Sequence, residues 1–311
     1  MTKSIKDFKI MTAIIEDARI PISILAKKCG LKRENVQYRL KNLEKNLIAG
    51  YQARINLKFT SDSIYTIYLN ISGLGREEII LRLRRLPRVH WIGSTLGRWN
   101  YVLAFSVNQE SSLSKFLDEL FIQFEKNHIN YSLAQQIKEY KDSFGGLFGN
   151  NLLIASQKDT KKIDLDETDK EILKYLAKNA RFSNSEIAEK IGMTREAVRM
   201  RIKNLEKLQI ILNYRALIKP QALELENFVL AIKCSSNLKE VSKICNFLCN
   251  NKSFSYVCAI AGEFNIISVV HLKSLRELDE VCTSLRSTFS EIVSEIEPLP
   301  LIEVASQNYL L

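Results

Sequence analysis

Residues 179–207 read NARFSNSEIAEKIGMTREAVRMRIKNLEK, and this stretch decides the fold. Ser183 and Glu186 have the spacing of a capping box, which starts a helix by satisfying its first backbone N–H groups. Gly192 is placed to end that helix in a left-handed conformation, and Thr194 is placed to cap the next one. With a helical pattern of apolar residues before them, these signals predict a helix-turn-helix unit.

The same pattern occurs a second time, 162 residues earlier, as DARIPISILAKKCGLKRENVQYRLKNLEK at residues 17–45. KNLEK is repeated letter for letter at 41–45 and 203–207, and Ala18-Arg19 returns as Ala180-Arg181. A weaker repeat follows, in which Gly97 corresponds to Gly262. A repeat that runs through both halves predicts a tandem fusion of one structural unit.

The third helix of each unit is predicted to be the recognition helix. Val198, Ile202 and Leu205 recur at a helical spacing and form its buried face. Outward residues of such a helix reach base edges in the major groove, where Arg suits guanine and Asn or Gln suits adenine. The side chains expected at DNA are Arg33, Glu34, Asn35, Gln37, Tyr38 and Lys41 in the first unit, and Thr194, Arg195, Glu196, Arg199, Met200 and Lys203 in the second.

The alternative for these polar residues is a solvated helix face, and for Arg39 and Arg201 an ion pair with a neighbouring Glu is as good a prediction as a DNA contact. KNLEK itself is expected to be structural. The local charge favours DNA, because residues 27–58 hold nine Lys and Arg against two Glu, and residues 188–219 hold eight against three.

Each half continues with a second domain. Short strands at 48–57 and 210–218 are predicted to form a wing or tether. The order strand, helix, strand, strand, helix, strand then follows, which is typical of a ferredoxin-like domain. One face of each sheet is expected to carry its helices, and the other to meet a second sheet. The predicted α+β domains are 1–58 (winged helix-turn-helix), 59–140 (ferredoxin-like), 141–162 (linker), 163–219 (winged helix-turn-helix) and 220–311 (ferredoxin-like).

Composition agrees with a DNA-binding protein. The net charge is +10, which favours polyanionic partners. No apolar run is long enough to span a membrane, and the start has no signal-peptide pattern, so a cytoplasmic location is predicted. The six cysteines form no C-x-x-C pair and are expected to be reduced core thiols. No metal site, cofactor or catalytic grouping is predicted.

These features resemble the Lrp/AsnC family of leucine-responsive or feast/famine regulators. The resemblance rests on IDLDETDKEIL at 163–173, on RFSNSEIA at 181–188, and on GYQA at 50–53. It implies a RAM- or ACT-like effector domain that dimerises through its sheet, and binding to pseudo-palindromic operators, often in response to amino acids. Family members usually have one unit per chain, so this fusion is predicted to act as a covalent pseudo-dimer with two unlike recognition helices.

The effector site implied by the resemblance falls at Gly97, Asn100, Gly262 and Asn265. The family commonly has Asp where this sequence has the two Asn residues. Asparagine lacks the carboxylate charge that would favour an amino-acid ammonium group, so a different ligand, or none, is expected. The alternative for the two glycines is a tight turn without a ligand.

Other interpretations stay open from sequence alone. One is an enzyme of related build, the siroheme decarboxylases, although His90, His128 and His271 do not recur between the halves. Another is an architectural protein that binds DNA without sequence preference. The first helix-turn-helix, which lacks a capping box, is also open to a purely structural role. Self-association through the ferredoxin-like domains is predicted in addition.

Overall fold

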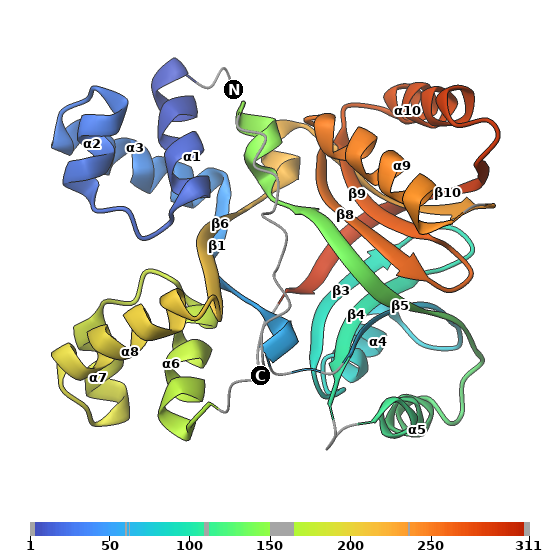
Figure 1. The fold of residues 1–311 in the computed structure, drawn as a ribbon, viewed down its shortest axis with the longest axis horizontal. Helices are drawn as coiled ribbons and strands as arrows, with labels where there is room; N and C mark the ends of the chain where they lie inside the picture. The colour runs from blue at the N-terminus through green and yellow to red at the C-terminus, as the bar shows by residue number, and fades with distance from the viewer. Residues whose placement is uncertain are drawn as a thin grey trace.

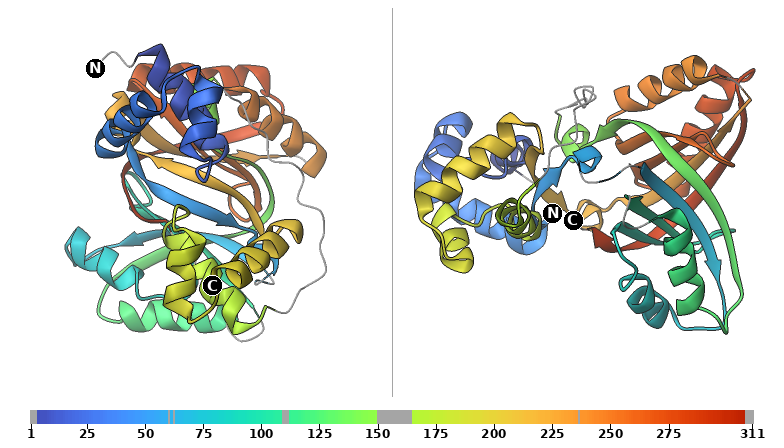
Figure 2. Two further views of the ribbon diagram at one scale, coloured as in Figure 1. Left: turned by 90° about the vertical axis from the view of Figure 1, so that its left-hand side faces the viewer. Right: turned by 60° about the horizontal axis from the view of Figure 1, so that its bottom comes forward.

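In the computed structural model two helical heads lie at one end and a β-barrel at the other, joined by a narrow two-stranded ribbon (Figures 1 and 2). The structure describes residues 4–59, 61, 63–108, 112–149, 165–235 and 237–307. None of the helices within these ranges combines the length and the apolar character that a membrane crossing requires.

Each head is a three-helix unit, as the sequence predicts. Ser183 and Glu186 form the expected capping box, and Gly192 ends its helix at a φ of 67°. Thr194 caps the next helix by accepting from the N–H of Ala197. The helices are α1 (Ile5–Glu16), α2 (Ile22–Cys29) and α3 (Arg33–Asn46) in the first head, and α6 (Glu167–Lys178), α7 (Asn184–Ile191) and α8 (Arg195–Lys207) in the second.

The strands that follow the recognition helices pair with each other. β1 (Ile48–Ile55) runs antiparallel to β6 (Ile211–Ile218), with Ala53 opposite Tyr214 and Tyr51 opposite Ala216. We call this pair the central ribbon. It is the tether that the sequence predicts, and its partner strand comes from the other half of the chain.

The two ferredoxin-like domains form one closed barrel in the order β10-β3-β4-β2-β5-β8-β9-β7. Each half contributes four strands in ferredoxin-like order, and the fourth strand of each half also pairs with the second strand of the other, as β5–β8 and β10–β3. This confirms the α+β tandem repeat. The strands are β2 (Ser63–Ile71), β3 (Val89–Thr95), β4 (Tyr101–Val107), β5 (Ile129–Asp142), β7 (Glu226–Cys234), β8 (Phe254–Ala261), β9 (Ile266–Leu272) and β10 (Val293–Gln307).

The faces of the barrel are divided as expected. Helices lie outside, packed on one face of each sheet (Figure 1). The inner faces meet in a shared core to which both halves contribute, including Tyr68, Trp99 and Phe264. The edge-to-edge joining of the sheets was not predicted. The outer helices are α4 (Arg76–Leu83), α5 (Leu113–Gln123), α9 (Leu238–Asn250) and α10 (Leu275–Thr288).

The linker predicted at 141–162 begins later than expected. Lys141 still belongs to β5, is fully buried, and donates to the backbone carbonyls of Cys249 and Asn251. A 3-10 turn, Phe144–Phe148, then packs against α1, with the rings of Phe148 and Phe8 5.7 Å apart. The glycines here therefore belong to a packed turn rather than a hinge. The rest of the predicted linker, from residue 150, lies outside the described residues.

All six cysteines are buried, and none of them forms a disulfide. Burial raises the pKa of Cys234 and Cys249 to about 11, so these side chains are neutral thiols at physiological pH. This confirms the interpretation of the cysteines as core residues.

His271 is a buried neutral imidazole in β9. Its Nδ1 lies 2.7 Å from the side-chain oxygen of Asn227, and its Nε2 lies 2.7 Å from the hydroxyl of Ser255. Burial lowers the pKa of His271 from 6.5 to about 4. The unfolded chain therefore binds more protons than the folded chain between these two values.

The stability that His271 contributes is present above pH 6.5 and is lost as pH falls toward 4. We expect this residue to reduce the free energy of unfolding by about 3 kcal/mol between pH 7 and pH 4. Urea unfolding at several pH values checks this. The His271→Gln variant should lose this part of the pH dependence, whereas a control at exposed His128, His128→Gln, should keep it. Equal pH profiles for His271→Gln and the wild type would contradict the account.

Candidate nucleic-acid interface

The two recognition helices present the predicted DNA contacts on their outer sides. Val36, Leu40 and Leu43 of α3, like Val198, Ile202 and Leu205 of α8, are buried in the heads. The predicted contacts that are exposed are Arg33, Glu34, Tyr38, Lys41, Thr194, Arg195, Glu196, Met200 and Lys203, whereas Asn35, Gln37 and Arg199 are half-buried.

Two of the predicted contacts have structural roles as well. The Thr194 hydroxyl is used as the cap of α8. The side-chain oxygen of Asn35 accepts from Nε of Arg39, 2.7 Å away, on the same helix. These two side chains help to orient the recognition helices, whatever they contact on a ligand.

Arg39 and Arg201 connect each recognition helix to the start of the first helix of its head. Arg39 donates to Asp7 over 2.8 Å, and Arg201 donates to Asp166 and Asp169 over 2.7 and 2.9 Å. Of the two predictions for these arginines, the structure favours the ion pair, but the partner is an Asp of another helix rather than a neighbouring Glu.

The exposed faces of the two recognition helices differ in chemistry. On α8, Arg199 donates through Nε to both carboxylate oxygens of Glu196, each 2.9 Å away. This contact lowers the pKa of Glu196 and raises that of Arg199. The equivalent residues of α3 are Glu34 and Gln37, which form no such ion pair because Gln37 carries no charge. Tyr38 and Met200 also stand at equivalent positions with unlike side chains.

A reciprocal clamp holds the two heads against the central ribbon. Arg19 of the first head donates to the carbonyl of Ala180 over 3.1 Å, and its guanidinium lies 5.1 Å from the ring of Tyr214. Arg181 of the second head donates to the carbonyl of Ala18 over 2.9 Å and lies 4.0 Å from the ring of Tyr51. In the sequence, Arg19 and Arg181 stand out only because Ala-Arg is repeated, and this repetition is the signal of their role.

The glutamates of the two KNLEK segments complete the clamp. Glu44 accepts from the Tyr51 hydroxyl over 2.7 Å and pairs with Arg181 over 3.1 Å. Glu206 accepts from the Tyr214 hydroxyl over 2.6 Å. The leucine and glutamate of each KNLEK segment are therefore structural, and Glu44 and Glu206 tie the recognition helices to the ribbon.

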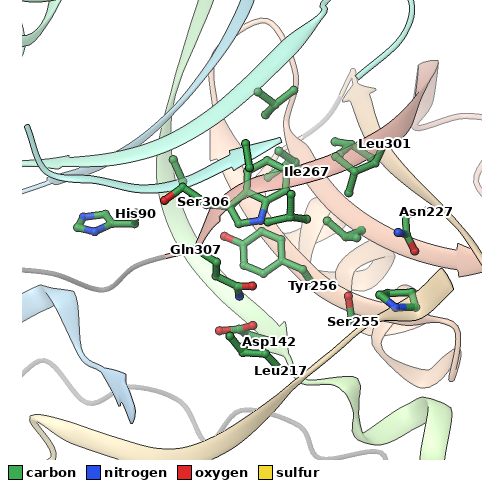
Figure 3. Close-up of a pocket in the computed structure, with 18 of the residues that line it drawn as sticks. His90, Asp142, Leu217, Asn227, Ser255, Tyr256, Ile267, Leu301, Ser306 and Gln307 are labelled. Atoms are coloured by element: carbon green, nitrogen blue, oxygen red, sulfur yellow. The ribbon is translucent and has the colours of Figure 1, made fainter. Parts of the chain in front are cut away.

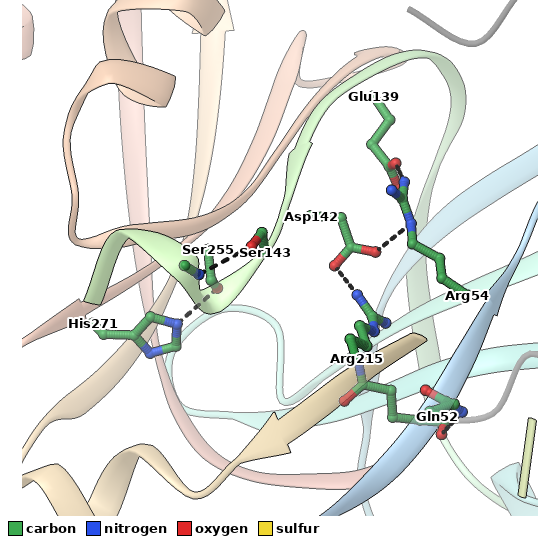
Figure 4. Close-up of polar contacts among 10 residues, drawn as sticks. Gln52, Arg54, Glu139, Asp142, Ser143, Arg215, Ser255 and His271 are labelled. Carbon is green, nitrogen blue, oxygen red and sulfur yellow. Dashed lines mark hydrogen bonds and ion pairs between the residues drawn. The ribbon is translucent and has the colours of Figure 1, made fainter. Parts of the chain in front are cut away.

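A second set of charges ties the ribbon to the barrel (Figure 4). Arg54 of β1 pairs with Glu139 and, over 3.1 Å, with Asp142 of β5, and Arg215 of β6 pairs with Asp142 over 2.5 Å. Burial, only partly offset by Arg54, raises the pKa of Glu139 to about 7. Both arginines were counted among the charges that favour DNA. They are buried within this joint instead, so they add little to a DNA-facing surface.

Comparison with known proteins assigns the chain to a family. An AsnC-type helix-turn-helix domain matches residues 165–206, and a winged helix-turn-helix DNA-binding domain matches residues 3–46. An uncharacterised HTH-type transcriptional regulator of Pyrococcus furiosus is 35% identical over 116 residues, which cover 37% of this chain and 78% of that protein. The chain belongs to the Lrp/AsnC family. A second such regulator, from Pyrococcus horikoshii, is 28% identical over 147 residues, or 47% of this chain and 93% of that protein.

This Lrp/AsnC regulator also shares its fold, over nearly its whole length, with a solved enzyme structure. The siroheme decarboxylase NirDL matches with a TM-score of 0.65 and 14% identity, over 98% of this chain and 93% of that one. At this identity the likeness concerns the fold alone. The curated relatives each match about one unit, whereas this enzyme matches both.

The predicted effector residues of the regulator lie at the turns β3–β4 and β8–β9, but their side chains serve the backbone. Asn100 accepts from the N–H of Ile71 over 3.0 Å and donates to its carbonyl over 2.8 Å. Asn265 accepts from the N–H of Cys234 over 2.7 Å. Gly97 adopts a φ of 116°, which favours glycine. A Cβ on Gly262 would lie 2.6 Å from the Leu133 carbonyl oxygen. Each of these four residues therefore has a role in forming its turn that does not depend on a ligand.

Replacement of either clamp arginine should destabilise the regulator. Arg181→Met removes two hydrogen bonds and a ring contact, and Arg19→Met removes an equivalent set. We expect each to lower the free energy of unfolding by about 2 kcal/mol, as for hydrogen bonds to charged groups. Urea denaturation of the full chain measures this. Arg286→Met, on the outer helix α10, is the control, and an effect of the clamp variants no larger than that of the control would refute the clamp.

Proposed function

We propose that this regulator recognises a specific two-part DNA site as a covalent pseudo-dimer, with one chain supplying both recognition helices. The observation that carries the proposal is the interlocked arrangement of the heads. β1 and β6 pair along their length, and each head is clamped through Arg19 or Arg181 to the other half. Two heads held in this way present α3 and α8 at a fixed separation, which is what half-sites about one helical turn (roughly 34 Å) apart require.

The contacts between the halves favour pairing within the chain over pairing between identical units. Arg98 and Glu263 stand at equivalent positions of the two β-turns, and they form an ion pair of 2.6 Å across the barrel. In a pair of identical units the same residue would meet itself, so the charges would be alike and repel. This complementarity supports a pseudo-dimer that forms within one polypeptide.

The two half-sites of the proposed operator are unequal. The α8 side offers Arg195 and the paired Arg199, and the α3 side offers Arg33 and Gln37. Arg prefers guanine and Gln prefers adenine at the major-groove edge. Lys41 and Lys203 are assigned to phosphates, where they add affinity without sequence information.

Three further expectations from the sequence remain proposals. Copies of the chain would have to associate through their outer helices, because β3–β10 and β5–β8 pairing already occupies the sheet edges within the chain. A response to a small-molecule effector is also proposed, at a site other than the β-turns. The cytoplasm, as the compartment that holds the DNA of a prokaryotic cell, is the proposed location.

The fold shared with siroheme decarboxylase NirDL makes an enzyme the second candidate. That protein was solved with an iron-uroporphyrin III analogue, and uroporphyrin III carries many carboxylates. The cavity of the barrel is lined by Glu139, Asp142, Glu303 and a single lysine, Lys219, and Arg54 and Arg215 are already paired with Glu139 and Asp142. The lining therefore offers little positive charge to a polyanion, so we favour the regulator. A tetrapyrrole absorbance band in the purified protein would favour the enzyme.

Selection of bound duplexes from a random library, at physiological salt, tests the proposed function. The wild type should select a two-part motif. Arg195→Ala should lose sequence information on one side only and Arg33→Ala on the other, because each bidentate arginine contact is worth about 1–3 kcal/mol of discrimination.

Lys203→Ala is the matched control, since loss of a phosphate contact should weaken binding to all sequences alike. The absence of any motif would support an architectural DNA-binding protein instead. An unaltered motif for Arg33→Ala, alongside a reduced one for Arg195→Ala, would assign a structural role to the first head.

A further inference from the structure

A cavity of about 550 Å³ opens at the end of the barrel that faces the central ribbon (Figure 3). Its floor is the inner face of the barrel, and residues of the ribbon, including Ala49, Leu217 and Ile218, complete its wall. A cavity of this size is in the range that holds a drug-sized organic molecule. None of the DNA-binding residues contributes to it.

Many residues that line the cavity come in equivalent pairs from the two halves. Trp91 of β3 and Tyr256 of β8 stand 165 positions apart, and both line the cavity, where the ring of Tyr256 is seen in Figure 3. They provide aromatic surfaces on the two halves of the barrel. Such surfaces favour a ligand with a flat apolar body.

The buried histidines also lie at equivalent positions of the two halves, but histidine and serine have changed places between them. His90 of β3 lies 2.7 Å from Ser106 of β4, and His271 of β9 lies 2.7 Å from Ser255 of β8. Ser255 is the equivalent of His90, and His271 is the equivalent of Ser106. A His–Ser couple is therefore present on each side of the barrel although neither histidine recurs in sequence. His90, His271 and Ser255 all line the cavity.

The two sides of the cavity differ in polarity, which a pair of identical units would not allow. The first half contributes Thr66, Gln136 and Glu139, and the equivalent residues of the second half are Val229, Leu301 and Val304. These three positions are polar in the first half and apolar in the second, although the second half also contributes polar residues such as Asn227, Ser255 and Glu303. An amphipathic ligand would satisfy the polar and the apolar lining residues, whereas a wholly polar ligand would leave the apolar ones without contacts.

The charged groups at the cavity lie close to one another and largely balance. Glu139 and Asp142 face the cavity, and the arginines nearest to them, Arg54 and Arg215, are already engaged in ion pairs with these carboxylates. Glu303 adds a further carboxylate, and exposed Lys219 is the one lysine of the lining. An uncharged hydrogen-bond donor such as a hydroxyl or an aromatic amine group is the complementary chemistry.

We propose that the cavity at the barrel mouth is a binding site for an amphipathic small molecule that has an apolar ring body and an uncharged, donor-bearing polar end. The polar end lies at Gln136 and Glu139, and the body lies between Trp91 and Tyr256. This proposal specifies where the effector of the proposed regulator binds and what chemistry it has, so it rests on the proposed function. A ligand here touches the barrel and the ribbon together, and the ribbon carries both heads.

A matched pair of fluorescent probes tests the site directly on the full chain. N-phenylnaphthylamine has an apolar ring body and one N–H donor, and anilinonaphthalene sulfonate has the same body with an added anionic group. We expect the neutral probe to bind at a single site with a micromolar dissociation constant. The sulfonate should bind at least about ten-fold more weakly, because Arg54 and Arg215 are already paired with carboxylates and the buried anionic group would lack a partner. Equal affinity for both probes, or no saturable binding of the neutral probe, would overturn the proposal.

Two variants locate the bound probe. Ala104→Phe fills the cavity and should reduce the affinity for the neutral probe at least about ten-fold. Gln136→Leu removes a polar group of the cavity wall and should reduce it to a smaller extent. Gln135→Leu changes the neighbouring exposed residue, which bonds Ser63 over 3.1 Å, and should have no effect. Undiminished probe binding by Ala104→Phe would overturn the proposal.

DNA binding is measured on the same preparations. Ala104→Phe should bind the selected duplex as the wild type does, which also shows that the variant is folded. Failure of the wild type to select a motif, with probe binding intact, would refute the DNA proposal alone. Motif selection without probe binding would refute the cavity proposal alone.

Discussion

The antiparallel pairing of β1 with β6 is the constraint on which the rest of the structure depends. The two strands connect heads to barrel, so their register fixes where both heads lie. Their side chains also complete the cores of the heads: Ala53 and Ile55 of β1 pack in the second head, and Ala216 and Ile218 of β6 pack in the first. Each head is therefore incomplete without the other half. A lone unit would expose these apolar faces, which explains why the units occur as a pair.

Fusion of the two units has allowed their shared surfaces to become unlike. Arg98 meets Glu263 across the barrel, and the ribbon is joined to β5 by ion pairs but to β10 by a hydrogen bond from Gln52 to the carbonyl of Gln307. Equivalent positions of the cavity, such as Gln136 and Leu301, differ in polarity for the same reason. In identical units a substitution changes both sides at once, and in a fused chain it changes one. Unequal recognition helices and an asymmetric cavity follow from the same event.

The sequence predicted the local structure well and the joining of the halves poorly. A capping box, a turn glycine and helical periodicity depend on residues close together in sequence, such as Ser183, Glu186 and Gly192. The helices and their order could therefore be inferred. Edge pairing of β5 with β8 depends on strands that are far apart in sequence and carries no local signal. Among the site residues, exposure of Arg33 and Arg195 could be predicted from the helical pattern. Burial of Arg54 and Arg215 could not, because their acidic partners lie on another strand.

Native mass spectrometry of the chain with its selected duplex tests the central claim most directly, because it counts the chains on one two-part site. If one polypeptide supplies both recognition helices, the complex at limiting protein will contain one 35.7 kDa chain for each duplex, and self-association will add chains and duplexes in equal numbers. A duplex with a single half-site should then bind much more weakly with the same stoichiometry. A complex that requires two chains for one two-part site would contradict the account, since each chain would then use only one of its heads.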